Sequence, residues 1–365
     1  MDPQKEGTGK HVLLTGANGF VATHILADLL DRDYSVTATV RSESKAEIML
    51  KGHPSWKTKV NFQYVPDITT DGAFDQVFKE GRPFDYIIHA ASPVNLEVED
   101  IQGSLINPAV RGTNSILKSA NKYGGPTLRR FVLLASAVGI LNSFEDLSKP
   151  GKPYTEKDWN PVTAAQAIEK KDPVLGYNVS KKLAEKAAWD FMHNNETGFD
   201  LTAICPDIII GPMIHTMFGP KSVNVTNRFA IYNFIDGTHK KIDGVTFPFW
   251  HYVDVRDVAR AHVDSLTNQA ASGQRIILVS DLLTPQLVVN VIRKNFPELR
   301  SRVPEGNPSQ ILPTGIQPTG WDTRVSLNIL SKGSKSKSWK YIDLETCVVD
   351  AVKSMIDADV ISRKS

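Results

Sequence analysis

The sequence predicts an α/β protein with a doubly wound parallel sheet and a smaller C-terminal lobe. Short β-branched runs alternate with longer amphipathic runs through the first two-thirds of the chain. The short runs are apolar on both faces, as in parallel strands that helices cover on each side. Beyond about residue 207 the alternation loosens, and Pro, Gly and aromatic residues are scattered through 211–250. That composition suits loops and short elements that cover a pocket.

Length and composition agree with this fold class. The chain has 365 residues, enough for two domains or for one large α/β fold with an added lobe. Hydrophobic residues make up 41% and charged residues 22%, which excludes a largely disordered protein. The net charge of +2 argues against a nucleic-acid binder. Because Cys205 and Cys347 are the only cysteines, we expect neither a disulfide framework nor a metal site.

The alternation places the elements in order along the chain. Strands are predicted in six apolar runs, at 11–15, 35–40, 60–65, 85–90, 130–136 and 201–206. Between them, helices are predicted at 20–30, 101–123 and about 175–195. The C-terminal part is predicted to contain a helix at 253–268, a strand at 275–279, and helices at 284–297 and 344–356. The lysine-containing stretch 331–340 reads as a solvated loop.

The turn after the first predicted strand carries the pattern of a dinucleotide site. Gly16 permits the tight turn, and Gly19 lets the backbone approach a pyrophosphate at a helix N-terminus. Ala22 replaces a third glycine and still allows close packing of helix and strand. The pattern stands between a strand and a helix, as it must. We therefore assign cofactor binding to this turn, through Thr15, Gly16, Asn18, Gly19, Phe20 and Val21.

The residue that ends the second strand selects the dinucleotide. An acidic residue there would bind the ribose hydroxyls of NAD, but this chain has Arg41, followed by Ser42 and, one turn later, Lys45. A guanidinium suits a 2′-phosphate, and the serine hydroxyl can donate to it. The residues therefore predict NADPH/NADP+ as the cofactor. The alternative is that Arg41 is only a surface residue.

Asp67 follows the third predicted strand. There it can accept a hydrogen bond from the adenine amino group, and the neighbouring Ile68 is assigned to the same site. A turn or capping aspartate would have the same sequence pattern, so both interpretations stay open.

Tyr177 and Lys181 supply the candidate chemistry. They lie four residues apart in a predicted helix, which puts both on one face. A phenol has an ordinary pKa of about 10, and an ammonium beside it is expected to lower that pKa and make the tyrosine an acid–base group. Ser136 ends the fifth predicted strand, the edge at which open α/β sheets bind ligands. Its hydroxyl could hold a substrate carbonyl oxygen, although a serine at a strand end is more often a turn residue.

With these motifs the chain resembles the extended short-chain dehydrogenase/reductases over nearly its whole length. It is most similar to fungal NADPH-dependent aldehyde, ketone and methylglyoxal reductases, and to dihydroflavonol and cinnamoyl-CoA reductases. The matching segments are TGANGFVA (15–22), VRSESK (40–45), HAASP (89–93), NPAVRGTNSIL (107–117), RFVLLAS (130–136), EKDWNP (156–161), YNVSK (177–181) and YVDVRDVA (252–259).

The resemblance implies a role for each matching position. Ser136, Tyr177 and Lys181 would form the catalytic triad, with Lys181 also binding the ribose hydroxyls and Asn107 a weaker candidate for a proton relay. The nicotinamide and its ribose would be lined by Ala90, Ala91, Ser92, Pro206 and Ile209. The chain departs from relatives at Leu134 and Ala135, which make the pocket beside Ser136 more apolar. A second departure, Val94, stands where relatives often have an aromatic residue, so substrate preference is left open.

We therefore expect an NADPH-dependent carbonyl reductase that converts an aldehyde or ketone to an alcohol with Tyr177 as proton donor; one interpretation is a ketoreductase of secondary metabolism. The alternatives are a nucleotide-sugar epimerase or dehydratase of the same superfamily, or an NADP-sensing protein without turnover. We divide the chain into a polar tail (1–10), a Rossmann domain (11–206) and a substrate-binding lobe (207–365), of which about 252–280 returns to the Rossmann domain.

Several expectations concern the surroundings of the enzyme. The polar first ten residues show no secretory signal and no run is long enough to span a bilayer, so we expect a cytoplasmic monomer or homodimer that binds no membrane. His89 is expected to pack beside the cofactor without titrating, and His251 to lie in a loop. Phe247, Phe249 and Trp250 are expected to line either the substrate cleft or the lobe's core.

Overall fold

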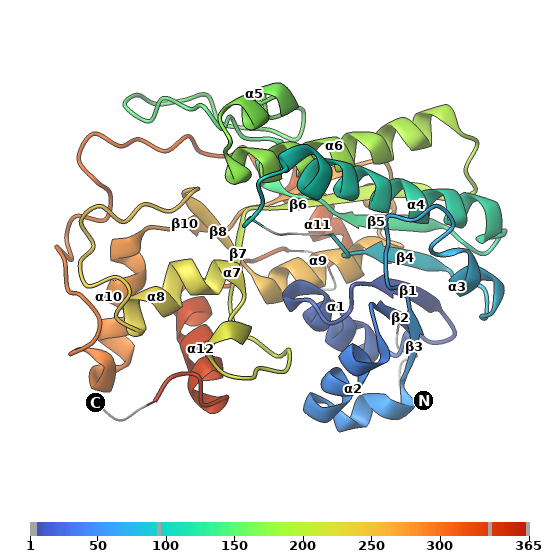
Figure 1. Cartoon of the computed structure of the whole chain (residues 1–365), viewed down its shortest axis with the longest axis horizontal. Coiled ribbons are helices and arrows are strands. Elements are labelled where there is room, and N and C mark those ends of the chain that lie inside the picture. Colours follow the sequence, from blue (N-terminus) through green and yellow to red (C-terminus); the bar gives the residue numbers. More distant parts are fainter. Residues whose placement is uncertain (1–5, 93–95, 335–337, 363–365) are drawn as a thin grey trace.

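The computed structural model describes residues 6–92, 96–334 and 338–362. Its centre is a parallel sheet of seven strands in the order β3-β2-β1-β4-β5-β6-β9 (Figure 1). The strands are β1 (His11–Thr15), β2 (Ser35–Val40), β3 (Val60–Tyr64), β4 (Tyr86–His89), β5 (Arg130–Leu134), β6 (Asp200–Pro206) and β9 (Arg275–Leu278). The strand order reverses at β1, which pairs with β2 on one side and β4 on the other. A crevice at the carboxyl ends of the strands is expected at such a reversal.

Helices cover both faces of this sheet. Helices α1 (Phe20–Asp31) and α9 (Val255–Thr267) pack together on one face, and α4 (Asn107–Tyr123) and α6 (Pro173–Asn194) on the other. The pleat sends neighbouring strand residues to opposite faces, so Leu14 belongs to the core under α1 and Leu13 to the core under α4. This two-sided burial explains the apolar strands of the sequence.

The lobe has a second, small sheet and its own core. Its strands are β7 (Ile208–Ile210), β8 (His251–Asp254) and β10 (Asp281–Leu282), in the order β10-β8-β7. Helices α10 (Pro285–Asn295) and α12 (Leu344–Asp357) pack on each other, and Phe234, Tyr252 and Val352 belong to the buried core there.

The remaining helical segments are short. They are α2 (Glu43–Gly52), α3 (Asp75–Lys79), α5 (Ala164–Glu169), α7 (Val225–Asn227), α8 (Asn233–Ile235) and α11 (Arg324–Gly333), the π-helical turns Gln102–Ile106 and Arg228–Tyr232, and the 3-10 turns Pro54–Thr58, Ala137–Gly139, Pro220–Ser222, Gln269–Ala271 and Pro297–Leu299. Among the described residues, no helix is both long and apolar enough to cross a membrane.

The structure corrects several predicted boundaries. The strand predicted at 130–136 ends at Leu134, because the chain turns there into the 3-10 segment Ala137–Gly139. The helix predicted at 253–268 starts as strand β8, since Tyr252 and Val253 pair with Ile208 and Ile209. The stretch 331–340 was predicted as a loop, but its first residues belong to α11, which packs on α9 and β9. Residues 335–337 of this stretch lie outside the described residues, as do Val94 and residues 1–5.

Candidate active site

The β1–α1 turn is pressed against the segment that follows β4. Gly16 has a φ of +67°, a conformation that favours glycine, and a Cβ added to it would lie 2.8 Å from the Cα of Ala91. Only glycine therefore fits here. This close approach brings the glycine-rich turn beside Ala91, in the segment that also holds Ala90 and Ser92, at the carboxyl edge of the sheet.

The buried side chain of Thr15 stabilises the same contact. Its fully buried hydroxyl accepts hydrogen bonds from the backbone N–H groups of Ala90 (3.2 Å) and Ala91 (3.1 Å). Because both lone pairs of the oxygen are then used, its hydrogen points to Nδ1 of His89 at 2.8 Å. The Thr15 side chain thus holds two strand ends together, so Thr15 can meet a cofactor only through its backbone.

His89 is buried beside the site, and burial, together with the charge of Lys181, lowers its pKa to about 3. The ring is therefore neutral near pH 7. It packs against Phe74 and Phe131 and does not titrate in the physiological range, as expected for this residue.

The N-terminus of α1 offers a cradle for phosphate. Gly19 caps the helix without a side-chain hydrogen bond, so the N–H groups of the first turn have no side-chain partner. These groups and the helix dipole suit a pyrophosphate. The Phe20 ring lies edge-on to the rings of His24 and His215, with 6.0 Å between ring centres in both pairs, and the Val21 side chain is buried. Phe20 and Val21 can therefore bind a phosphate only through their backbone N–H groups.

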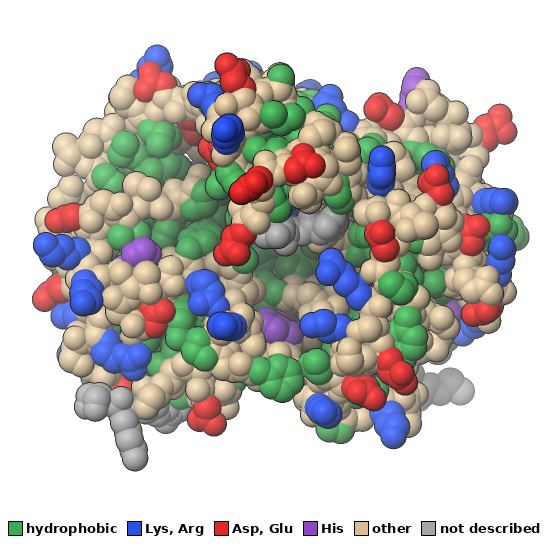
Figure 2. Space-filling model, in the orientation of Figure 1, with side chains coloured by type: hydrophobic (Ala, Val, Ile, Leu, Met, Phe, Trp, Pro, Cys, Tyr) green, Lys and Arg blue, Asp and Glu red, His purple; other side chains and the backbone are tan. Residues whose placement is uncertain are grey.

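Arg41, Ser42 and Lys45 lie where β2 passes into α2. Arg41 and Lys45 are exposed, and in the part of the chain that the structure describes neither side chain has an ion pair or hydrogen bond. Ser42 shares a hydrogen bond of 2.9 Å with Ser44. Two unpaired cations beside the nucleotide cradle fit a group with an additional phosphate. Figure 2 shows this face hollowed near its middle, with Lys and Arg side chains below the hollow and Asp and Glu side chains above it.

Asp67 makes a turn after β3. Its Oδ1 accepts hydrogen bonds from the backbone N–H (2.8 Å) and hydroxyl (2.7 Å) of Thr69, and these bonds lower the pKa of the carboxyl. Asp67 therefore acts as a turn residue, as one of the two interpretations held. Its exposed side chain can still accept a hydrogen bond from an adenine amino group. Ile68 packs against Gly112 of α4, where a Cβ would lie 2.9 Å from the Ile68 side chain.

Ser136, Tyr177 and Lys181 meet at the same edge of the sheet. Ser136 lies just past β5 and caps the 3-10 turn, accepting from the N–H of Val138 at 3.4 Å. A hydrogen bond joins the Ser136 hydroxyl and the Tyr177 phenol. Lys181 follows one turn later on α6, with its Nζ 5.9 Å from the centre of the Tyr177 ring. The structure thus brings together the three residues that sequence spacing singled out.

The electrostatics of this group differ from the expectation. Burial raises the pKa of Tyr177 to about 12, against the opposing effect of the Ser136 hydrogen bond, and burial lowers the pKa of Lys181 to about 8. The prediction that Lys181 lowers the pKa of Tyr177 is therefore wrong for the protein without cofactor, because loss of solvation outweighs any attraction by the ammonium. Tyr177 accordingly carries its proton at neutral pH, as a proton donor should.

The other predicted residues lie nearby. Asn107 starts α4, and its Oδ1 accepts from Gln102 at 2.7 Å, so its amide NH₂ group is the part that remains for a relay. Pro206 ends β6, and Ile209 is the middle residue of β7. Their roles stay predictions.

Asn160 and Lys182 hold the loop that follows Ser136, and neither was among the predicted site residues. The Asn160 side chain donates to the carbonyl of Val138 and to Ser143 Oγ, both at 2.7 Å. Lys182 Nζ donates to the carbonyl oxygens of Asn160 (2.9 Å) and Val162. The residue after Lys181 thus ties α6 to the loop of Ser136, which fixes Ser136 relative to Tyr177.

A cavity of about 260 Å³ lies between α6 and the lobe, and the described residues that line it do not include Ser136, Tyr177 or Lys181. It borders α6 at Asn178, directly after Tyr177, and β6 at Asp207, directly after Pro206. Phe249 and Trp250 line it, whereas Phe247 is buried in the lobe's core. His251 also lines it from strand β8, so the prediction of a loop histidine is wrong; the strand forms by pairing with β7 and β10.

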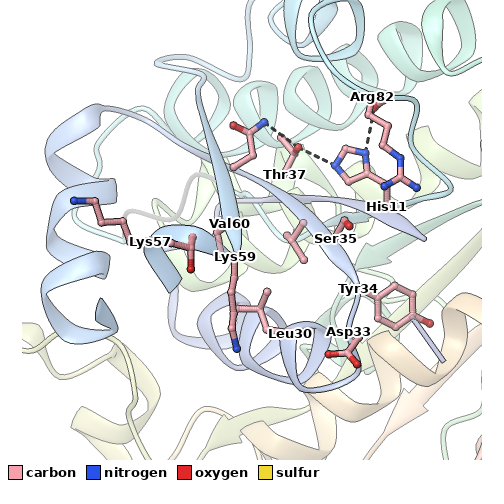
Figure 3. A pocket seen from close by; sticks show the side chains of 13 residues that line it. His11, Leu30, Asp33, Tyr34, Ser35, Thr37, Lys57, Lys59, Val60 and Arg82 are labelled. Atoms are coloured by element: carbon pink, nitrogen blue, oxygen red, sulfur yellow. Dashed lines mark hydrogen bonds between the residues drawn. The ribbon is translucent and has the colours of Figure 1, made fainter. Parts of the chain in front are cut away.

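A larger cavity, about 680 Å³, lies at the opposite edge of the sheet (Figure 3). It is lined where β1, β2 and β3 begin, by residues such as His11, Ser35 and Val60. The His11 ring is held by Thr37 and by the carbonyl of Arg82, and Lys57 and Lys59 point in different directions. Because parallel sheets bind ligands at the carboxyl ends of their strands, we assign no chemistry to this cavity.

Known proteins are similar to this chain over most of its length. The model of the NAD dependent epimerase/dehydratase family matches residues 12–279. A ketoreductase of Aspergillus niger is 36% identical over 354 residues, covering 95% of this chain and 98% of the relative. The NADPH-dependent methylglyoxal reductase of Saccharomyces cerevisiae is 35% identical over 300 residues, covering 81% and 86%.

Solved structures extend the comparison. The crystal structure of yeast methylglyoxal/isovaleraldehyde reductase in complex with NADPH is 31% identical, with a TM-score of 0.84 over 96% of this chain and 100% of that one. A UDP-glucose 4-epimerase of Thermotoga maritima has a TM-score of 0.69 over 95% of this chain and 99% of that one, but at 17% identity it shows the fold alone. The chain therefore belongs to the NAD dependent epimerase/dehydratase family, as its resemblance to extended short-chain dehydrogenase/reductases implied.

Proposed function

We propose that this protein is an NADPH-dependent carbonyl reductase that converts an aldehyde or ketone to an alcohol. The observation that carries the proposal is the hydrogen-bonded pair of Ser136 and Tyr177, with Lys181 one turn away, beside a cradle suited to a dinucleotide. The similarity to a ketoreductase and to an NADPH-dependent methylglyoxal reductase supports the same activity.

In this proposal the cofactor, when bound, supplies the hydride. The hydroxyls of Ser136 and Tyr177 hydrogen-bond the substrate oxygen, where negative charge develops, in the manner of an oxyanion hole. Tyr177 then gives its proton to that oxygen. Its raised pKa keeps the proton in place until the oxygen becomes basic. Lys181 holds the ribose hydroxyls and places a positive charge near the phenol as it loses the proton.

In this proposal, residues at the carboxyl edge of the sheet hold the cofactor. The backbone of the turn at Gly16, Asn18 and Gly19 binds the pyrophosphate, and Arg41, Ser42 and Lys45 bind the 2′-phosphate. Asp67 and Ile68 contact the adenine. The nicotinamide end is lined by Ala90, Ala91, Ser92, Pro206 and Ile209.

The two alternative functions fit the site less well. A nucleotide-sugar epimerase or dehydratase needs cations for the substrate's diphosphate, but the described residues that line the cavity between α6 and the lobe include no lysine or arginine. A regulatory protein that only senses NADP has no use for a complete Ser136–Tyr177–Lys181 group.

The test is NADPH oxidation by the purified protein with a panel of aldehydes, ketones and nucleotide sugars. We expect turnover with at least one aldehyde or ketone and slower turnover with NADH. Conversion of a nucleotide sugar without net NADPH oxidation would favour the epimerase. Tight NADPH binding with no turnover of any carbonyl compound would favour the sensor.

We further propose that the enzyme works in the cytoplasm as a monomer or homodimer. Cell fractionation with an antibody to the chain tests the location. Light scattering after size-exclusion chromatography tests the oligomeric state, and a tetramer or larger assembly would contradict it.

A further inference from the structure

Ser143 and Asn160 lie near the two ends of the long loop between the 3-10 turn Ala137–Gly139 and helix α5. The Ser143 hydroxyl oxygen accepts hydrogen bonds from the Asn160 side chain at 2.7 Å and from the Asn178 side chain at 3.0 Å. Both asparagines are buried, with 2% of Asn160 and 1% of Asn178 exposed. The two donors occupy both lone pairs of the oxygen. Ser143 therefore connects this loop to α6, the helix that carries Tyr177.

The Asn160 side of this connection leads to Ser136. The second hydrogen of the Asn160 amide is donated to the carbonyl of Val138 at 2.7 Å, and its Oδ1 accepts from the N–H of Val162 at 3.0 Å. Both N–H groups and the oxygen of the amide are thus used, which fixes its orientation. The N–H of Val138 in turn donates to Ser136 Oγ at 3.4 Å. Asn160 therefore links the position of Ser143 to that of Ser136.

The Asn178 side of the connection leads to the proposed proton donor. Asn178 follows Tyr177 directly on α6, so its hydrogen bond to Ser143 holds the helical turn that carries the phenol. The Ser136 hydroxyl and the Tyr177 phenol are themselves hydrogen-bonded. The contacts close a ring in the order Ser136, Val138, Asn160, Ser143, Asn178 and Tyr177. Because the members of a closed hydrogen-bond network restrain one another, the separation of Ser136 and Tyr177 depends on Ser143.

Stability alone does not explain the amide of Asn178. Asparagine is a poor helix former, yet Asn178 lies within α6. Among the described residues its buried Oδ1 has no hydrogen-bond partner, and an acceptor left in this way lowers the stability of a fold. Residues that break such rules are expected at functional positions. The cost of Asn178 thus points to a functional use of its hydrogen bond to Ser143.

We propose that Ser143 and Asn178 are positioning residues that hold the Tyr177 phenol at the distance from Ser136 at which both hydroxyls reach one substrate oxygen. The proposal rests on the carbonyl reductase function proposed above. In it, Ser143 and Asn178 do not touch the reacting atoms but act through the two hydroxyls. A displacement of about 1 Å can cost on the order of 100-fold in rate, so a small shift of Tyr177 is enough to slow the reaction.

Direct contact with the substrate is the alternative, because Ser143 and Asn178 also line the cavity between α6 and the lobe. A contact with substrate would change KM and the ranking of carbonyl compounds, as is expected for other residues of that lining. Loss of positioning would instead lower kcat by the same factor for every carbonyl compound and leave KM nearly unchanged, since the lost effect is made only in the transition state.

The test measures kcat and KM of Ser143→Ala, Asn178→Ala and the double variant, with NADPH and at least three carbonyl compounds that wild type reduces. We expect kcat to fall by about 10-fold in each single variant, less than for a full 1 Å displacement, because Asn160 still holds Val138. The double variant should lose no more than the worse single variant, because both changes remove the same hydrogen bond. Ser143→Thr keeps the hydroxyl and should restore most of the activity.

Ser119→Ala is the matched control. Ser119 is 2% exposed, and its hydroxyl donates to Asp75 at 2.7 Å, joining α4 to α3 away from Ser136 and Tyr177. This variant also removes one buried hydrogen bond, so its free energy of unfolding in urea should fall, but its kcat should not. Asn178→Ala should show the opposite split, with lower kcat and little change in stability, because it also removes the unpartnered acceptor. Active sites are counted by NADPH titration, so partial loss of folded protein does not affect kcat.

If Ser143→Ala does not fold, Asn178→Ala and Ser143→Thr carry the test. Unchanged kcat in Asn178→Ala, losses that differ from one carbonyl compound to another, or additive losses in the double variant would overturn the positioning role. Absence of turnover by wild type with any carbonyl compound would instead overturn the reductase function itself.

Discussion

The phosphate cradle at the start of α1 and the cavity that borders α6 lie at the same edge of the sheet but are assembled in different ways. The cradle is one continuous turn, 15–22, and its shape depends on backbone conformation: a left-handed Gly16 and a helix N-terminus without a side-chain cap. The cavity gathers side chains from Leu141 to Trp321, carried by α6, β8 and loops. Backbone geometry is dictated by a few local residues, whereas a lining of distant side chains depends on how the lobe packs.

This difference has a functional consequence. Every dinucleotide presents the same pyrophosphate, so a backbone cradle can be reused without change. Substrates vary, and a cavity lined by side chains can change one residue at a time without disturbing the sheet. The comparison therefore predicts that changes in the cradle alter cofactor binding for all substrates, while changes in the cavity alter the ranking of substrates.

The largest effect on turnover is expected when the proton donor is removed. Tyr177→Phe keeps the ring but removes the proton donor, so kcat should fall by at least about 100-fold. The NADPH dissociation constant, measured by fluorescence titration, should change little. Near-normal turnover in this variant would contradict the assignment of Tyr177.

Gly16→Ala tests the backbone cradle. The left-handed φ costs an alanine roughly 1–2 kcal/mol, and its Cβ would lie 2.8 Å from the backbone of Ala91. Moving that backbone should cost a further roughly 1–3 kcal/mol, which corresponds to roughly 5- to 150-fold weaker NADPH binding. Gly273→Ala is the matched control, since Gly273 has the same φ of +67° but open space around it. If both variants bind NADPH equally well, the close approach does not shape the cradle.

Arg41→Ala tests coenzyme choice within the cradle. A charge-assisted hydrogen bond to the 2′-phosphate favours NADPH over NADH by roughly 10- to 150-fold in affinity. Because Lys45 and Ser42 remain, the loss of NADPH affinity in Arg41→Ala should lie near the lower end of this range. The kcat/KM with NADPH should fall while that with NADH stays almost constant, and Arg41→Asp should go further. Lys57→Ala, an exposed lysine at the opposite edge, should change neither. Equal losses for both coenzymes would mean that Arg41 acts through folding.

The smallest effect is the pH dependence contributed by Lys181. Burial lowers its pKa from 10.5 to about 8, so the folded chain releases this proton at a lower pH than the unfolded chain does. The free energy of unfolding should therefore rise between about pH 8 and pH 10.5, and NADPH affinity should fall a few-fold as the ammonium is lost. Lys181→Met should lack both trends when urea unfolding and cofactor titrations are repeated across this range. A flat wild-type profile would contradict the lowered pKa.

The sequence by itself was enough for the sheet and the cradle. Alternating apolar runs predicted six strands that all lie in the main sheet, and a seventh at 275–279 joins it as β9. The glycine spacing at Gly16 and Gly19, and the four-residue spacing of Tyr177 and Lys181, are local relations. Local relations survive in a sequence because strand pleat, helix period and turn conformation act over a few residues.

Only the tertiary structure decided the rest. No local pattern distinguishes Asp207 or Trp321, which are 114 residues apart in sequence and meet only when the lobe packs on β6. The same is true of Lys182, whose contacts with the carbonyls of Asn160 and Val162 place Ser136 against Tyr177. The raised pKa of Tyr177 likewise follows from its burial. Burial depends on how segments distant in sequence pack together, and the residues next to Tyr177 in the sequence do not determine it.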